Sequence, residues 1–235
     1  MSSIITPESI LSYPHLFEPQ SAKGDSNPPK FSCTFVFPEG TDLDDLKKAA
    51  VGLAKERWDA KLGKAKLTTL ETQYGPATFL VGGSLRLRMP WRDDADHIAQ
   101  KGYPEGSAYV TARSRAESPP GVVSAIPDPS NDGKPARIVS TSGDVRYRDG
   151  TVLTAARPVY AGVIGRGLLS VFTYDNNGNT GVGLGLNGVQ VIRDGERLDG
   201  RKRAEDVFEA DSETAVDLSD LTGGAEEDDL SDLIG

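Results

Sequence analysis

The chain has little sulfur or imidazole: one cysteine, Cys33, and two histidines, His15 and His97, among 235 residues. A single cysteine excludes an internal disulfide and suits a reducing compartment. Three such groups are too few for the usual zinc sites. No apolar run approaches the roughly 20 residues that a membrane helix needs. The first ten residues lack a basic segment followed by an apolar run. We therefore expect an intracellular chain with no signal peptide and no membrane contact.

Motifs of nucleotide and hydrolytic chemistry are also missing. No Gly-Lys-Ser or Gly-Lys-Thr occurs, which argues against a phosphate-binding loop, and no G-x-S-x-G elbow presents a nucleophilic serine. The run GVGLGLNG follows a turn signal and opens no helix, so it fails the context of a dinucleotide site. We interpret it as a strand whose glycine face is approached closely by another backbone or by a ligand. No cofactor and no metal are expected.

What the chain does have is a strong separation of charge. The net charge is −9, but residues 204–235 carry twelve acidic side chains and no Lys, Arg or His. Residues 1–203 keep 26 basic against 23 acidic groups, a net charge of +3. A basic body with a polyanionic tail suits a nucleic-acid binder whose tail imitates the phosphate backbone. It equally suits a globular domain with a solubilising, disordered tail.

One strong helix is predicted over residues 42–62. Thr41 is the expected N-cap, and three aspartates follow at the positive end of the helix dipole. Gly63 is the expected stop. The apolar stripe that would face the core, with Trp58 as its anchor, is Leu43, Leu46, Ala50, Leu53 and Trp58.

The rest of the pattern is mainly β. Residues 1–30 look irregular, whereas residues 30–37 alternate as a strand with Phe31, Cys33, Phe35 and Phe37 on one face. Strand-like pieces and turn signals continue to a hairpin turn at residues 175–181 and a return strand. The expected fold class is therefore mainly β, a small β-barrel of the OB-fold type with one inserted α-helix. Composition alone does not separate it from a β-sandwich.

Residues 84–174 interleave cations and aromatic rings. Non-specific binding of single strands needs a cationic groove for phosphates and aromatic faces on which bases stack. Arginine outnumbers lysine by ten to two in this stretch. The planar guanidinium can form two hydrogen bonds with one phosphate and can also stack on bases. Phe172, Arg137 and Arg148 belong to the same stretch. The predicted DNA-binding residues are Arg86, Arg88, Trp91, Arg92, Lys101, Tyr103, Tyr109, Arg113, Arg115, Arg146, Tyr147, Arg157, Tyr160, Arg166 and Tyr174.

A second interpretation comes from the acidic cluster WRDDADH. Asp93, Asp94, Asp96 and His97 could hold a divalent ion, as the paired carboxylates of a nuclease do. A solvated loop explains the same residues. Loss of metal-dependent cleavage when Asp93 and Asp94 become Asn would identify the nuclease.

Three segments, taken together, resemble a family of phage single-stranded DNA-binding proteins. They are SYPHLFEP, KFSCTFVFPEGTDLDDLKKA and, most specifically, the block from YAGVIGRGLLSVFTYD through GLGLNGVQVIRDGE to GRKRAEDVF. The likeness covers nearly all of residues 10–208. It implies a non-enzymatic OB-fold that binds single-stranded DNA during phage replication, recombination or repair, in the cytoplasm of the infected host. A structural phage protein that does not bind DNA is the remaining alternative.

The resemblance also implies a domain of residues 1–203 and a flexible acidic tail of residues 204–235 that recruits replication or recombination proteins. Many single-strand binders end in acidic residues and an aromatic, whereas this chain ends DDLSDLIG. Weaker binding to double-stranded DNA and a homo-oligomer are left open. The tail residues expected to dock on partners are Glu226, Glu227, Asp228, Asp229, Leu230, Asp232, Leu233 and Ile234.

Tethering gives the tail a high effective concentration near the basic body. Our hypothesis is that it occupies the DNA groove in the free protein and is displaced by DNA. Leu230, Leu233 and Ile234, at i, i+3, i+4 spacing, would then be free to contact a partner.

Overall fold

The computed structural model describes residues 3–21, 28–62, 68–69, 78–81, 85–176 and 179–198. Two α-helices, α1 (Asp44–Leu62) and α2 (Ala95–Gln100), and a 3-10 turn at Pro129–Asn131 accompany the strands. None of the described helices is long and apolar enough to cross a membrane. The strands are β1 (Ser3–Ile5), β2 (Ser9–Gln20), β3 (Lys30–Phe37), β4 (Thr68–Thr69), β5 (Thr78–Val81), β6 (Leu85–Arg88), β7 (Trp91–Arg92), β8 (Ala108–Arg115), β9 (Gly121–Asp128), β10 (Lys134–Ile138), β11 (Val145–Arg146), β12 (Val152–Leu153), β13 (Ile164–Asn176) and β14 (Asn179–Arg193).

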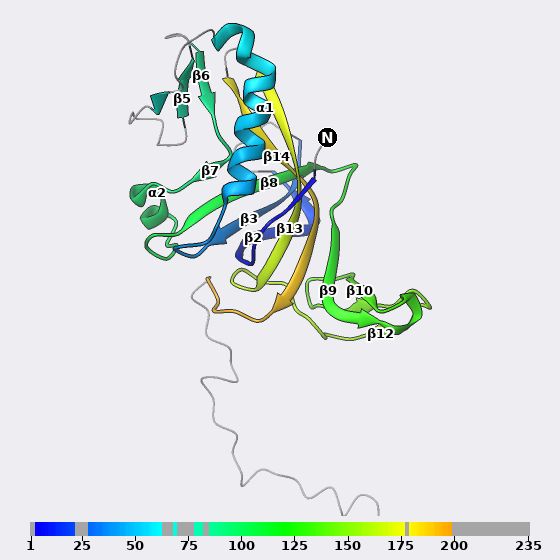
Figure 1. Ribbon diagram of the computed structural model, residues 1–235. Coiled ribbons are helices and arrows are strands. Elements are labelled where there is room, and N and C mark those ends of the chain that lie inside the picture. Colours follow the sequence, from blue (N-terminus) through cyan, green and yellow to red (C-terminus); the bar gives the residue numbers. More distant parts are fainter. Residues whose placement is uncertain are drawn as a thin grey trace, which may run out of the picture. The chain divides into compact units, whose positions relative to one another are not determined.

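Five of these strands close into a barrel (Figure 1). Hydrogen-bonded pairing runs from β13 to β2, β3, β8 and β14, and β14 pairs back with β13. All pairs are antiparallel except β8 with β14, which meet in parallel at Arg113 and Gly185. A closed five-stranded β-barrel is the architecture expected of an OB-fold, so the predicted fold class is confirmed and the sandwich alternative is not adopted.

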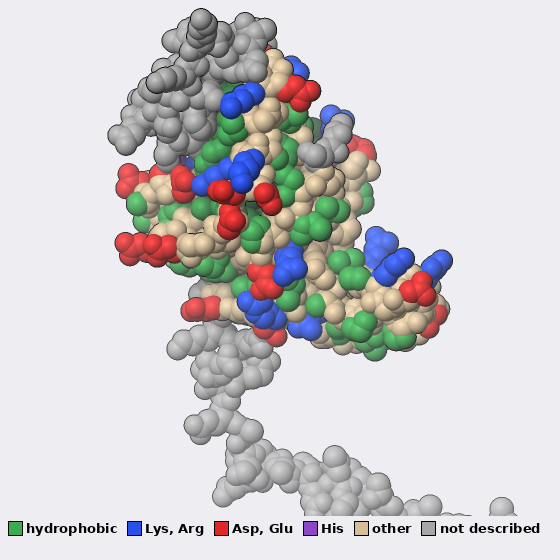
Figure 2. All heavy atoms as spheres, viewed as in Figure 1, with side chains coloured by type: hydrophobic (Ala, Val, Ile, Leu, Met, Phe, Trp, Pro, Cys, Tyr) green, Lys and Arg blue, Asp and Glu red, His purple; other side chains and the backbone are tan. Residues whose placement is uncertain are grey.

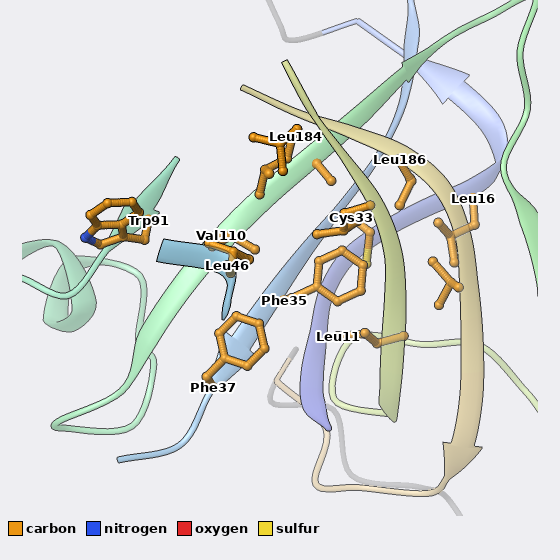
Figure 3. Close-up of a cluster of buried hydrophobic side chains, with 14 of the residues drawn as sticks. Leu11, Leu16, Cys33, Phe35, Phe37, Leu46, Trp91, Val110, Leu184 and Leu186 are labelled. Atoms are coloured by element: carbon orange, nitrogen blue, oxygen red, sulfur yellow. The ribbon is translucent and has the colours of Figure 1, made fainter. Parts of the chain in front are cut away.

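The barrel interior follows the alternation read from the sequence. Phe31, Cys33, Phe35 and Phe37 of β3 are all buried, and the leucines of β14 meet them from the opposite wall (Figure 3). Burial in this apolar setting raises the pKa of the Cys33 thiol.

Helix α1 packs on β13 and β14. Its stripe is close to the predicted one, because Trp58 is buried as expected and Ala54 takes the fully buried position while Leu53 is partly exposed. The N-cap prediction is wrong: the Thr41 hydroxyl donates to the Pro38 carbonyl at 2.7 Å, and the Asp42 carboxylate accepts from the Asp44 amide at 2.8 Å. Gly63 lies outside the described residues.

The prediction for the N-terminal segment was wrong. Residues 1–30 looked irregular, but β2 is a twelve-residue strand. Its prolines, Pro14 and Pro19, lie where its register against β3 shifts, between Ser12 and His15 and between His15 and Gln20. Such shifts accommodate a residue that cannot donate to the ladder.

Beyond the barrel, β9 continues the sheet from β14 into β10, β11 and β12. We call these four strands, residues 121–153, the arm; Figure 1 shows it leaving the barrel at β9. Asp128 accepts hydrogen bonds from the amides of Ser130 and Arg148, at 2.9 and 2.7 Å, and Asp144 accepts one from the Ala155 amide at 2.9 Å. These carboxylates brace the turns of the arm.

Candidate nucleic-acid interface

A groove of about 1050 Å³ runs over the outer face of the barrel, between β3, β8, β13 and β14 and the residues around Pro90. A second cavity of about 430 Å³ lies over β2, β3 and β8. The two share Lys30, Thr111 and Arg113 as lining residues, so they form one continuous surface. We call it the groove.

The groove exists because β3 and β8 are amphipathic in matched register. Lys30 stands opposite Arg115, Ser32 opposite Arg113, and Thr34 opposite Thr111. The two threonine hydroxyls are 2.9 Å apart and hydrogen-bonded. The polar face of β3 and the predicted Thr111, Arg113, Arg115 face of β8 therefore lie side by side, while their apolar faces fill the barrel.

The groove is strongly cationic. Among the described residues that line it there is no Asp or Glu. Two of the cations, Lys30 and Arg115, are direct cross-strand partners, an arrangement that is unfavourable unless an anion lies between them. The six cationic lining residues are Lys30, Arg88, Arg92, Lys101, Arg113 and Arg115.

Two aromatic rings from β13 lie along the same groove. Phe172 is 41% exposed and stands opposite Gly183 of β14, and Tyr174 stands opposite Gly181. A β-carbon at Gly183 would lie 2.7 Å from the Phe172 ring. A β-carbon at Gly181 would lie 2.7 Å from the Tyr174 hydroxyl oxygen. The glycine face predicted for this strand therefore provides the space into which the two rings pack.

A third ring, Tyr13 of β2, lines the smaller cavity and was missed by sequence reasoning. It is 56% exposed, has a left-handed backbone with φ of 47°, and lies under the Lys101 ammonium, which is 5.9 Å from the ring centroid. Left-handed conformations are uncommon for side chains of this size and occur preferentially at functional sites.

Of the fifteen predicted DNA-binding residues, the groove brings together six: Arg88, Arg92, Lys101, Arg113, Arg115 and Tyr174. The side chain of Arg86 lies outside the described residues, as do all the tail residues named above. Lys30 was missed because a lone cation at a strand end carries no signal until the register places it opposite Arg115.

Several predicted aromatics belong to the core instead, which corrects their assignment as stacking platforms. Trp91, Tyr103 and Tyr160 are each less than 10% exposed. The Tyr103 hydroxyl donates to Ser12 at 3.1 Å, and its ring meets the half-buried Tyr109 edge-on at 5.4 Å between centroids. Burial raises the pKa of both phenols. Trp91, Tyr103 and Tyr160 are therefore too deeply buried for a base to stack on them.

The remaining predicted residues lie away from the groove. Arg146 is exposed on β11 of the arm, Tyr147 follows it and packs against the core, and Arg157 is partly buried in the loop before β13. Arg166 pairs with Glu8 at 3.1 Å, and Arg193 contacts the same carboxylate. The hydrogen bond from Arg193 is the main reason that the pKa of Glu8 is lowered.

The acidic cluster forms a short helix that was not predicted. Asp94 is the N-cap of α2 and accepts from the His97 amide at 3.0 Å, and its side chain also contacts the His97 imidazole. Asp93 lies 4.0 Å from the Lys47 ammonium. Among the described residues no group of three or more His, Cys, Asp or Glu could hold a metal ion. Asp94 thus caps α2, and Asp93 lies beside Lys47.

Comparison with solved structures places the fold. The single-stranded DNA-binding protein of bacteriophage Enc34, solved in complex with ssDNA, is 18% identical, with a TM-score of 0.50 over 83% of this chain and 89% of that one. A C-terminal truncation of the same protein is 18% identical, with a TM-score of 0.49 over 83% of this chain and 88% of that one. The single-stranded DNA-binding protein gp2.5 of bacteriophage T7 is 14% identical, with a TM-score of 0.45 over 86% of this chain and 98% of that one.

No curated protein matches the sequence significantly. The family model described as the ssDNA-binding protein of Enterobacter phage Enc34 matches residues 2–218. That match spans the barrel, the arm and part of the acidic tail. The chain therefore belongs to the Enc34 family of phage ssDNA-binding proteins.

Proposed function

We propose that this protein binds single-stranded DNA in the groove, without sequence specificity and without catalysis. The observation that carries the proposal is the groove itself, which six cations and no described carboxylate line and which also holds two rings that lie against glycines. Cations supply a salt-dependent attraction for phosphates, and rings stack on any base because every base has a π-face. The acidic cluster that a metal-dependent nuclease would use instead supplies the N-cap of α2, where Asp94 accepts from the His97 amide at 3.0 Å.

The biological role that follows is to coat transient single strands in the infected host cell during phage replication, recombination or repair. We also propose that the DNA-binding domain ends near residue 203 and that the acidic tail beyond it competes with DNA for the groove. The charge layout supports this, because a body of net charge +3 adjoins twelve acidic groups. DNA would release the tail, whose Leu230, Leu233 and Ile234 would then recruit replication or recombination proteins.

The test is a fluorescence-anisotropy titration of labelled oligo(dT) at about 50 and 200 mM salt, with wild type and the variant R113E/R115E. Wild type should bind tightly at low salt and weaken steeply as salt rises. The variant should bind far more weakly. For single strands, each phosphate that the protein neutralises adds about 0.7 to the slope of log K against log salt, so the slope should fall by about 1.4 or more.

A charge-matched control is K48E/K55E on α1. Both lysines are exposed, and neither lines the groove. This control should keep the wild-type salt slope. Equal losses of affinity in the two variants would mean that overall charge, and not the groove, determines binding. No binding by wild type would discard the proposal.

A further inference from the structure

The arm carries a row of cross-strand neighbours that spans all four of its strands, and three of the four side chains are exposed. The register places Val123 of β9 opposite Arg137 of β10, Arg137 opposite Arg146 of β11, and Arg146 opposite Val152 of β12. Arg137 and Arg146 are exposed, and Val152 is 46% exposed. Figure 2 shows Lys and Arg side chains on the arm, with Asp and Glu side chains beside them. We call these four residues the arm row.

Two arginines in direct cross-strand register repel each other, and this costs stability unless an anion is bound between them. No ion pair of Arg137 or Arg146 occurs among the described residues. The buried carboxylate of the arm, Asp128, is already engaged by backbone amides. Asp144 is engaged in the same way by Ala155 and by the Ser140 hydroxyl, at 2.9 and 2.8 Å. Asp128 and Asp144 thus brace the turns of the arm, while Arg137 and Arg146 form no ion pair among the described residues.

The arm joins the barrel beside the groove. Arg115 lines the groove at the end of β8, and β9 begins at Gly121 after a short connection. β9 then pairs in parallel with β14, whose Gly183 and Leu184 also line the groove. A chain of nucleotides that leaves the groove on this side would reach the arm without a break in the sheet.

We propose that the arm row is a second DNA-binding surface, which takes the phosphates of single-stranded DNA beyond the segment held in the groove. The guanidinium forks of Arg137 and Arg146 bind the phosphates, and the flanking valines contact the sugars. Arginine suits this role because its planar fork matches phosphate geometry. The inference rests on the proposed function of the groove and extends it to a longer site.

The test uses the full chain, with wild type and R137Q/R146Q, and two lengths of labelled oligo(dT). OB-folds occupy roughly 4–16 nucleotides, so an oligonucleotide of about 8 fits the groove and one of about 24 reaches the arm. The variant should bind the short oligonucleotide as wild type does. With the long one, its salt slope should be smaller than that of wild type by about 1.4, the value for two phosphates that the variant no longer neutralises.

Two further variants complete the design. K48Q/K55Q removes the same charge from α1 and should leave both titrations unchanged. R137K/R146K keeps the charge but not the fork, so it should keep most of the slope. Thermal unfolding checks that every variant folds, which is expected because both arginines are exposed.

An unchanged slope with the long oligonucleotide, or equal losses of affinity at both lengths, would overturn the second surface. A labelled peptide with the sequence of residues 221–235 is a further probe. If it bound wild type but not R137Q/R146Q while DNA binding was unaffected, the arm row would be a site for an acidic peptide and the proposal would be wrong. Failure of wild type to bind even the short oligonucleotide would instead defeat the proposed function.

Discussion

Phe172 is the groove residue whose proposed role in binding can be separated most cleanly from folding, because its ring is 41% exposed and lies against a glycine. One base stack is worth about 1–3 kcal/mol, so F172A should weaken oligo(dT) binding about 5- to 150-fold. Anisotropy titrations measure this directly. L168A is the matched control, since Leu168 is equally exposed on the same strand and does not line the groove. Equal effects of the two substitutions would contradict the stacking role.

Gly183 should matter through Phe172 alone. A β-carbon there would lie 2.7 Å from the far end of the ring, so the ring would have to move to another position. G183A should therefore tilt the ring and weaken binding, with little change in thermal stability. In an F172A background the same substitution should have no further effect. A double-mutant cycle measures this coupling, and additive effects would show that Gly183 acts in some other way.

At the residue scale, the sequence could predict charge better than aromatic roles. The alternation of β8 correctly places Thr111, Arg113 and Arg115 on one face. Alternation does not tell which face is covered, however, and here α2 and Tyr103 pack over one end of the sheet. Tyr103 is buried in that cluster, whereas Trp91 is buried in the main hydrophobic core.

Among the elements, long periodic segments were predictable and short ones were not. β3 and most of α1 follow from their apolar spacing. Helix α2 has six residues, fewer than two turns, which is too short to show a periodic apolar pattern. Its acidic residues therefore predicted a loop or a metal site, whereas Asp94 in fact caps the helix. β2 was hidden by Pro14 and Pro19, which the shifts in register accommodate.

The arm should weaken at acid pH. The Ala155 amide and the Ser140 hydroxyl lower the pKa of Asp144 from its ordinary value of 3.8. The pKa of Asp128 is also lowered, because hydrogen bonds from Ser130 and Arg148 outweigh the effect of its burial. A carboxylate with a depressed folded-state pKa contributes stability that is present above pH 3.8 and lost as the pH falls through that lower pKa.

D144N removes this charge. Wild type should therefore be more stable than D144N at pH 5, and the difference in unfolding free energy should shrink as the pH is lowered toward 2. Urea unfolding at several pH values provides the measurement. A difference that stayed constant with pH would mean that the charge of Asp144 does not stabilise the arm.

At the scale of the whole molecule, composition and turn spacing predicted a mainly β fold, and the family resemblance implied the OB-fold, but neither predicted how the barrel closes. The closing contacts join strands far apart in sequence, such as Ile10 with Ile164 and Arg113 with Gly185. Nor could local patterns predict the arm as a separate extension, because the sequence pattern of its strands does not differ from that of the barrel strands.

The separation of charge gives a prediction for the entire chain. Truncation after residue 203 removes twelve acidic groups and leaves a net charge of +3. If the tail competes for the groove, the truncated protein should bind oligo(dT) more tightly than the full chain at 50 mM salt. The advantage should narrow at high salt, where screening weakens the tail as well. Equal or weaker binding by the truncated protein at low salt would refute tail competition.

The closure of β2 onto β13 also governs when the barrel can form during synthesis. Ile10 and Ile164 are register partners separated by most of the domain, and β14 is the last strand of the barrel. A ribosome must therefore release nearly all of the domain before the phenylalanines of β3 can be covered. Folding dominated by such distant pairings is slow, and a nascent chain in this state exposes an apolar strand to aggregation. Chaperone supply would then help to set how soon newly made protein completes its barrel.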